Sequence, residues 1–439
     1  MPHGKRPDKR NGGINLLIEQ RKSLRGEISV PGDRSISHRA IIFGSIAKGT
    51  TEIDGLLMGE DCLSTIDCFR KMQVGIEILP GNRVKVHGRG LRDLKPPSAP
   101  LNTGKSGTTL RLLMGILVGQ SFSTVVNRAE SAQKKPVGKV VKSLRQMGAS
   151  IQGRDDGNLC PLMISPSKLR GITCELPVHD SHIKSTILIA GLYATGETTV
   201  VETVKSRDHT ELMLNYFGSD IRVDGLKVTS HSIENLYAQH IKVPGDISIA
   251  SYFITAGLLV PNSDITILNV GINPTRTGIL DVYKKMGAKM EVLNERFFGN
   301  EKVADIRVTT SQLKSTVIGE EMVPRLIDEI PVITVAAALA KGTTEIKGLK
   351  GFKIKESGRI KALVAELSKM GASLRETEDG LVIEGDRPLK GTVIESYNDY
   401  AIAMAMSVAG LIAEGETMIR KAQVVDVAFP EFFSTLERL

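Results

Sequence analysis

The sequence predicts an α/β protein of two domains, each built from three copies of one repeated unit. Three observations predict this fold class: the chain length, a recurring helix–turn–strand pattern, and a second helix that repeatedly ends at the same tripeptide. A chain of 439 residues is longer than one hydrophobic core usually supports, which favours two domains of about 200 residues each. Its content of 41% hydrophobic and 24% charged residues is ordinary for a globular protein.

The first helix of each predicted unit is apolar on every side, so we expect it to be buried. These helices are predicted at residues 41–47, 110–117, 187–193, 250–259, 332–340 and 401–412. Four of them are followed by a Gly-x-Thr turn and a β-branched strand, at Gly49, Gly196, Gly342 and Gly415. Weaker versions near Gly119 and Pro261 complete six units with a period of roughly 70 residues.

A second, amphipathic helix closes several of the units and stops at Met-Gly-Ala. This tripeptide occurs at 147–149, 286–288 and 370–372. Glycine directly after the last helical turn is typical of a helix C-cap, where it adopts a left-handed conformation. The residues after each tripeptide are therefore expected to begin a strand.

A polar loop precedes each of the six apolar helices. The loops read PGDRS, GKSGTT, HDSHIKS, PGDIS, RLIDE and YNDY. The first turn of a helix carries unpaired N–H donors and the positive end of the helix dipole, which attract anions. Serine and aspartate would also serve simply as helix caps. Because six such loops recur in register and several contain Lys or Arg, together they favour an anion-binding site.

Charge and composition limit the classes of partner that the protein is expected to bind. The formal net charge of +8 suits anionic partners, but the absence of tryptophan and an aromatic content of 4% argue against a surface that stacks nucleic-acid bases. No apolar stretch approaches the length of a membrane span. The four cysteines show neither a CxxC pair nor zinc-site spacing, which favours free thiols and no metal. We therefore predict a cytoplasmic protein that binds small anions, with no nucleic-acid or membrane partner.

Five stretches resemble the 5-enolpyruvylshikimate-3-phosphate (EPSP) synthase family. They are PGDRSISHR (31–39), SGTTLRLL (106–113), SRDHTE (206–211), GINPTRTG (271–278) and PRLIDEIP (324–331). The resemblance extends from about residue 24 to the C-terminus. It implies the enolpyruvyl-transferase fold, an inside-out α/β barrel of six βαβαββ-like repeats with a cleft between two domains. One domain would combine residues 1–32 with 244–439, and the other, inserted domain would be 33–243.

The resemblance also implies a reaction. The family transfers the enolpyruvyl group of phosphoenolpyruvate to the 5-hydroxyl of shikimate 3-phosphate by addition and elimination, without metal or cofactor. The acceptor hydroxyl must then lose a proton and the methylene carbon of phosphoenolpyruvate must gain one. Asp328 matches the family's general base, and Glu356 matches its acid near the methylene. The partners would be these two small anionic substrates, and the protein is expected to be a monomer.

Other positions match residues that bind the phosphate and carboxylate groups, which require fixed cations and N–H or O–H donors. These candidates are Arg34, Ser35, Arg39, Ser106, Gly107, Thr108, Lys135, Ser181, His182, Ser206, Lys355 and Arg359. Gly107 lies where the phosphoenolpyruvate site leaves no room for a side chain.

Several substrate-contact positions depart from the family pattern. The family has lysine at Arg34, arginine at Lys135 and glutamine at His182, and the His-Arg pair of its D-H-R motif is Tyr400-Ala401 here. Three interpretations follow: an ordinary synthase with an altered site, a paralogue that uses the scaffold on another acceptor or donor, or a catalytically impaired anion-binding relative. The presence of the matching acidic and basic residues argues against the last of these.

Overall fold

The computed structural model describes residues 5–7, 13–176 and 180–439, with the side chains of 13–176, 180–351 and 358–439. The chain folds into two compact units. Unit 1 is Met1–Pro31, Gly245–Arg296 and Lys302–Leu439, and unit 2 is Gly32–Pro244 with Phe297–Glu301. The passages at Pro31 and Pro244 lie close to the predicted boundaries, 32/33 and 243/244. The grouping of residues 297–301 with unit 2 was not anticipated, and it is accompanied by a buried His209 Nδ1–Glu301 Oε1 contact of 2.7 Å.

Unit 2 contains three sheets. The strands of the first are β4 (Ala47–Asp54), β5 (Gly75–Leu79), β6 (Arg83–Arg89), β15 (Leu236–Tyr237) and β16 (His240–Lys242). Those of the second are β7 (Leu101–Asn102), β8 (Thr124–Asn127), β9 (Ser150–Gly153) and β10 (Leu159–Ser165). Those of the third are β11 (Thr173–Leu176), β12 (Thr198–Glu202), β13 (Arg222–Asp224) and β14 (Lys227–Ser230).

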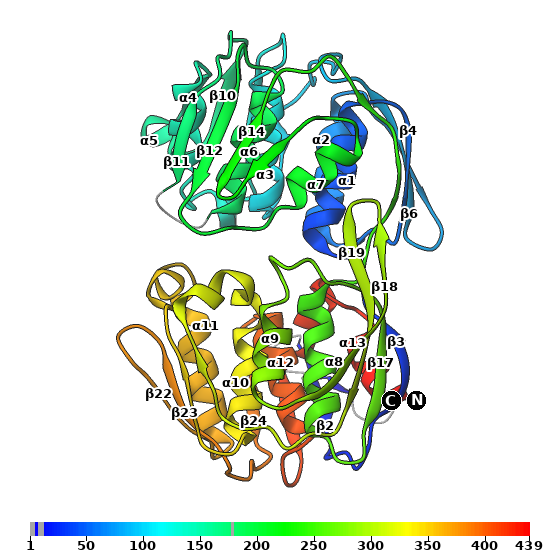
Figure 1. Cartoon of the computed structure of the whole chain (residues 1–439), viewed down its shortest axis with the longest axis vertical. Helices are drawn as coiled ribbons and strands as arrows, with labels where there is room; N and C mark the ends of the chain where they lie inside the picture. Colours follow the sequence, from blue (N-terminus) through cyan, green and yellow to red (C-terminus); the bar gives the residue numbers. More distant parts are fainter. Residues whose placement is uncertain (1–4, 8–12, 177–179) are drawn as a thin grey trace. The chain divides into compact units, whose positions relative to one another are not determined.

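The helices of unit 2 lie between these sheets in sequence. They are α1 (Arg34–Ile46), α2 (Glu60–Lys71), α3 (Gly107–Leu117), η1 (Glu130–Ala132), α4 (Gly138–Gln146), α5 (Arg154–Gly157), α6 (Ser181–Gly191) and α7 (His209–Tyr216). The long apolar helices α1, α3 and α6 lie inside the unit, with sheets around them (Figure 1).

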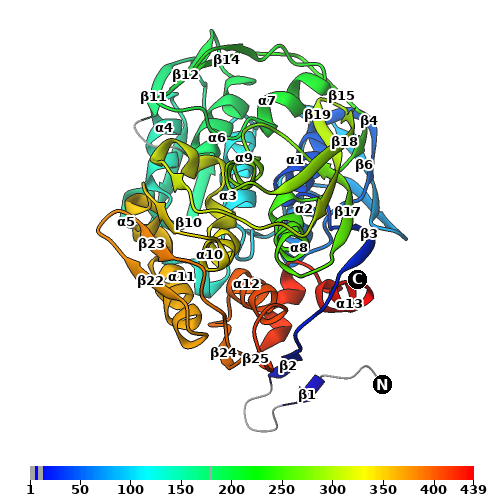
Figure 2. The same ribbon diagram turned by 60° about the horizontal axis from the view of Figure 1, so that its bottom comes forward.

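Unit 1 also contains three sheets. The first has β3 (Arg25–Ser29), β17 (Asp264–Gly271), β18 (Lys289–Phe298) and β19 (Glu301–Thr309). The second has β20 (Val317–Ile318), β21 (Thr343–Ile346), β22 (Ser373–Glu376) and β23 (Leu381–Glu384). The third has β24 (Val393–Glu395), β25 (Thr417–Arg420), β2 (Ile14–Ile18) and β1 (Lys5–Pro7), so the N-terminal strand β2 lies beside β25 (Figure 2).

The helices of unit 1 complete its three repeats. They are α8 (Ile247–Leu259), α9 (Gly278–Lys285), η2 (Glu320–Arg325), η3 (Ile327–Glu329), α10 (Ile330–Leu339), α11 (Lys350–Lys369), α12 (Tyr400–Gly410), η4 (Ala422–Val427) and α13 (Phe432–Arg438). The apolar helix α10 belongs to the core of unit 1, whereas α3 belongs to that of unit 2.

The six sheets formed by the described residues share one strand order, which confirms the predicted repeat. In the β7–β10 sheet, β7 is parallel to β8, and β8 and β9 are both antiparallel to β10. The β11–β14 and β20–β23 sheets repeat this arrangement. A parallel pair requires a crossover, and α3, α6 and α10 supply it in these three sheets.

The predicted glycine signals mostly hold. Gly148, Gly287 and Gly371 of the Met-Gly-Ala tripeptides have φ of +96°, +82° and +94°, the left-handed conformation of a helix C-cap. Gly49 does not lie in a turn before a strand as expected. It lies within β4, opposite Gly88, because the strand begins at Ala47 directly after α1. In the described part of the chain, no helix combines the length and apolarity that a membrane crossing requires.

Candidate functional site

The N-terminal ends of the three buried helices of unit 2 lie together. Thr108 Oγ1 of α3 is 3.1 Å from His182 Nε2 of α6, and Arg39 Nη2 of α1 donates to Ser185 Oγ of α6 at 3.0 Å. Each helix is also capped by its own loop. Asp33, Ser106 and Asp180 accept hydrogen bonds from backbone N–H groups in the first turns of α1, α3 and α6. The polar loops therefore act both as caps and as the support of a shared polar cluster.

Arg39 is the most firmly held of the predicted anion-binding cations. The residue is only 3% exposed, and its guanidinium donates to Thr210 Oγ1 at 2.7 Å and to the Ser35 carbonyl at 3.0 Å. Burial lowers the pKa of Arg39 to about 10, so it remains a cation at neutral pH. A buried, hydrogen-bonded guanidinium presents a fixed positive charge with little entropy left to lose on binding.

The other predicted residues of unit 2 differ in accessibility. Arg34, Ser35, Thr108, Ser181 and His182 are half-buried in the first turns of their helices. Ser106 is buried, and its hydroxyl accepts from both the N–H and the hydroxyl of Thr109. Lys135 is exposed in the loop between η1 and α4. Among the residues with described side chains, no hydrogen bond or ion pair joins Lys135 to the helix-end cluster, so its place in the site stays a prediction.

Two histidines in this cluster are held in their neutral form. Burial, together with the charges of Arg34 and Arg39, lowers the pKa of His38 to about 3. Burial and the neighbouring Arg111 likewise hold the pKa of His182 below its usual range. Positive charge that suppresses the protonation of nearby imidazoles marks a cationic region, which suits anionic ligands.

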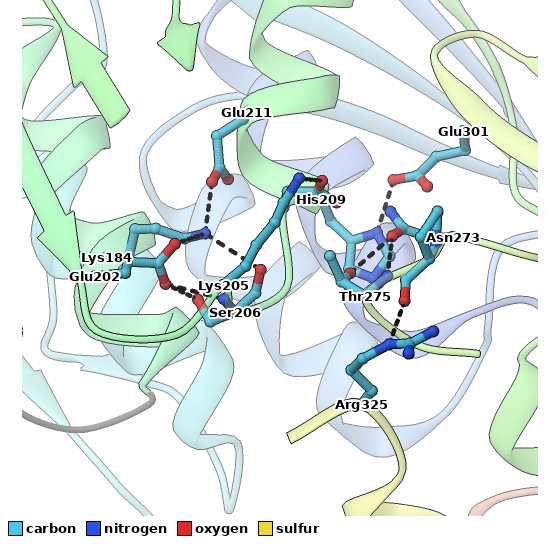
Figure 3. Close-up of polar contacts among 12 residues, drawn as sticks. Lys184, Glu202, Lys205, Ser206, His209, Glu211, Asn273, Thr275, Glu301 and Arg325 are labelled. Carbon is cyan, nitrogen blue, oxygen red and sulfur yellow. Dashed lines mark hydrogen bonds and ion pairs between the residues drawn. The ribbon is translucent and has the colours of Figure 1, made fainter. Parts of the chain in front are cut away.

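Ser206 is positioned by a buried ionic network that the sequence reasoning missed (Figure 3). Its hydroxyl and N–H both donate to Glu202 Oε1. Lys184 Nζ lies 3.1 Å from Glu202 Oε2 and 2.6 Å from Glu211 Oε1, and the Lys184 side chain is 1% exposed. The available signal was a lysine in an otherwise apolar helix, since a buried ammonium requires carboxylate partners.

The predicted general base, Asp328, lies in unit 1. Asp328 is half-buried in η3, directly before Glu329, whose Oε1 accepts a hydrogen bond from Ser248 Oγ. Arg276 Nη2 donates to the same hydroxyl at 2.8 Å and to Asp246 Oδ1 at 3.3 Å. These hydrogen bonds link the starts of α8 and α10, and Asp328 directly precedes Glu329, the residue that joins them.

Arg359 is the other predicted residue of unit 1 with a described side chain. Its Nε donates to Asp399 Oδ2 at 2.6 Å, and Asp399 Oδ1 accepts from the Ala401 N–H at 2.8 Å. This places the guanidinium at the start of α12. Lys355 and Glu356 lie outside the residues whose side chains the structure describes. Among those described, no group of three or more His, Cys, Asp and Glu side chains is arranged to hold a metal ion.

Comparison with known proteins places this arrangement in a single family. The family model for EPSP synthase (3-phosphoshikimate 1-carboxyvinyltransferase) matches residues 18–436. A 3-phosphoshikimate 1-carboxyvinyltransferase from Thermoanaerobacter sp. (strain X514) is 51% identical over 97% of this chain and 100% of its own length. One from Desulforamulus reducens is 48% identical over 97% and 99%. The solved structure of EPSP synthase from Acinetobacter baumannii superposes with a TM-score of 0.90 at 41% identity, covering 97% of this chain and 98% of its own.

Proposed function

This chain belongs to the EPSP synthase family, and we propose that it transfers the enolpyruvyl group of phosphoenolpyruvate to the 5-hydroxyl of shikimate 3-phosphate, releasing phosphate. The observation that carries the proposal is the cationic cluster at the starts of α1, α3 and α6. Arg34 and Arg39 lie at the start of α1, and the half-buried Ser181 begins α6. Fixed cations and helix N–H donors are what two phosphorylated, carboxylated substrates require.

The two proton transfers of the addition step each have a residue assigned to them. The acceptor oxygen forms a bond to C2 of phosphoenolpyruvate, and its proton passes to Asp328 acting as general base. The methylene carbon gains a proton, for which the family resemblance assigns Glu356. Elimination then breaks the bond from C2 to the phosphate oxygen, removes a proton from the methyl group and restores the double bond. Stabilisation of the phosphate and carboxylate charges by preorganised cations lowers the barrier of each step.

The two other interpretations of the altered positions are not favoured. Relatives at about half identity over nearly the whole chain carry the synthase name. Arg34 and Lys135 also keep the positive charge that the family has at those positions. The alterations therefore favour a synthase whose anion site uses different cations. They do not favour a protein that has lost the site.

The finer predictions belong to this proposal. We propose that the protein acts as a cytoplasmic monomer on these two small anions, without a cofactor and without a nucleic-acid or membrane partner. The direct test is phosphate release from phosphoenolpyruvate, measured with and without shikimate 3-phosphate. We expect release only when both substrates are present. Release without the acceptor, or no release with it, would contradict the proposal.

A further inference from the structure

Two arginines near the start of α3 have no carboxylate partner among the described residues. Arg128 follows β8 directly and is 4% exposed, and Arg111 is in the second turn of α3. Arg128 Nη2 donates to the Lys105 carbonyl at 3.2 Å, and Arg111 Nη1 donates to the Gly107 carbonyl at 3.3 Å. Arg128 Nε is buried and has no hydrogen-bond partner. Both cations are thus held by neutral carbonyls alone.

The two guanidiniums approach the first turn of α3 from different elements. A Cβ atom placed on Gly107 would lie 2.7 Å from Arg111 Nη1 and 3.8 Å from Arg128 Nη2. Gly107 is the first residue of this 11-residue helix. Both guanidiniums therefore lie beside the free N–H groups at the start of the helix.

This arrangement is unfavourable without a ligand. A buried arginine with no carboxylate in contact loses its hydration and gains only neutral hydrogen bonds in return, and the more distant charge of Asp61 opposes the lowering of the Arg128 pKa only weakly. Burial, with a smaller contribution from the like charge of Arg111, lowers the pKa of Arg128, although a guanidinium remains charged at neutral pH. A small oxyanion at the helix start would supply the missing negative charge and accept from the unpaired donors.

We propose that Arg128, together with Arg111 and the first N–H groups of α3, binds a small oxyanion, the phosphate or carboxylate group of the three-carbon donor. Naming the donor as phosphoenolpyruvate rests on the proposed function; the anion site itself rests on the geometry alone. Arg128 would then supply one of the donor-binding cations from the end of β8.

The test compares wild type with Arg128→Met, which keeps an unbranched apolar stem and removes the guanidinium and its charge. Binding of phosphoenolpyruvate, inorganic phosphate and shikimate 3-phosphate is measured separately by calorimetry. Loss of a charge-assisted hydrogen bond should weaken phosphoenolpyruvate binding about 10- to 100-fold and leave the acceptor unaffected. An equal loss for inorganic phosphate assigns the site to the phosphate group of the donor, and unchanged phosphate binding assigns it to the carboxylate.

Thermal unfolding supplies a readout that a purely structural arginine would not give. Without anions, Arg128→Met should have a higher Tm than wild type, because the buried uncompensated charge is gone. Where the site takes the phosphate group of the donor, the Tm of the variant should also rise less than that of wild type on addition of phosphate. Arg222→Met, which removes a guanidinium with 63% exposed side chain in the same unit, is the control and should change neither quantity.

The outcomes separate this inference from the proposed function. Unchanged phosphoenolpyruvate binding in Arg128→Met, weakened binding of the acceptor alone, or a lowered Tm with an unchanged phosphate response would overturn the inference even if wild type is an active synthase. If wild type releases no phosphate from its two substrates, yet binds phosphate in an Arg128-dependent manner, the anion site stands and the proposed function fails.

Discussion

The Lys184 ammonium lies 3.1 Å from the Glu202 carboxylate inside unit 2, with the two side chains 1% and 4% exposed. The other oxygen of that carboxylate accepts from the N–H and hydroxyl of Ser206. The position of Ser206, a predicted contact for the acceptor phosphate, is thus set through Glu202 by the charge of Lys184. Buried ion pairs of this kind fix geometry more reliably than they add net stability.

The first prediction concerns this network. Lys184→Met leaves Glu202 and the buried Glu211 without their shared cation, so the free energy of unfolding should fall by about 3–5 kcal/mol. Urea unfolding measures this loss. The control is Lys205→Met, because that ammonium is about half exposed beside Asp208. It should cost less than about 1 kcal/mol. A similar small loss in both variants would show that the buried triad does not depend on Lys184.

The second prediction concerns the general base. Asp328→Asn keeps the size of the side chain but cannot take the proton of the acceptor hydroxyl, so kcat should fall by about 10²–10⁴-fold with little change in substrate binding. Steady-state phosphate release measures this. Asp386→Asn is the control, since Asp386 is exposed in the same unit and its φ of +63° suits asparagine. Full activity in Asp328→Asn would assign proton removal to another group.

The third prediction is a pH dependence of stability. The pKa of His38 is lowered from 6.5 to about 3 by burial, then by Arg34 and Arg39, with His182 adding to the lowering and Asp33 opposing it. Between these values the unfolded chain binds a proton that the folded chain does not, so His38 costs stability as the pH falls. From pH 6 to 4.5 its contribution should fall by about 1.4 kcal/mol per pH unit.

Urea unfolding of wild type and His38→Asn across this pH range isolates the contribution. His38 Nδ1 lies 2.8 Å from Thr65 Oγ1, a contact that the asparagine side chain can replace. The wild type should lose more stability per pH unit than the variant. Parallel pH profiles would mean that His38 already titrates normally in the folded state.

The fourth prediction concerns the altered pair at the start of α12. Tyr400→His with Ala401→Arg restores the family residues beside Arg359, which is bonded to Asp399. If donor binding is limited by the missing cation, phosphoenolpyruvate should bind roughly one to two decades more tightly, as one charge-assisted contact provides. Phosphoenolpyruvate affinity and phosphate release are compared with wild type. Weaker affinity in the double variant would show that the native site is already complete and that the added arginine is misplaced.

The sequence was sufficient for the repeat and for most of the helix ends, because each depends on local patterns. The glycines after the amphipathic helices require φ > 0, and the apolar helices such as 330–339 have no polar face to expose. The prediction of a turn at Gly49 was wrong because the glycine-threonine pattern, which marks a turn in other repeats, lies within strand β4 here. In that strand Gly49 pairs with Gly88.

The members of the helix-end cluster were predictable only where they share a contiguous motif. Arg34, Ser35 and Arg39 belong to one stretch, and Ser181 and His182 to another. Lys184 and Arg128 were missed, because their roles depend on partners, or the lack of partners, in three dimensions. Lys184 meets a carboxylate 18 positions away, and Arg128 reaches the start of α3 from the end of a neighbouring strand. The apolar helix around Lys184 was the one local signal for that residue, whereas no local pattern distinguishes Arg128 from an ordinary surface cation.

The most direct measurement follows the bridging oxygen between C2 and phosphorus of phosphoenolpyruvate. With ¹⁸O at this position, wild-type protein and shikimate 3-phosphate, enolpyruvyl transfer breaks the bond from C2 to oxygen, so the released phosphate should contain the ¹⁸O. The acceptor should gain one enolpyruvyl group for each phosphate, as mass spectrometry of both products would show. Unlabelled phosphate with ¹⁸O retained in pyruvate would instead mean attack at phosphorus, and would contradict the assignment of this chain as an enolpyruvyl transferase.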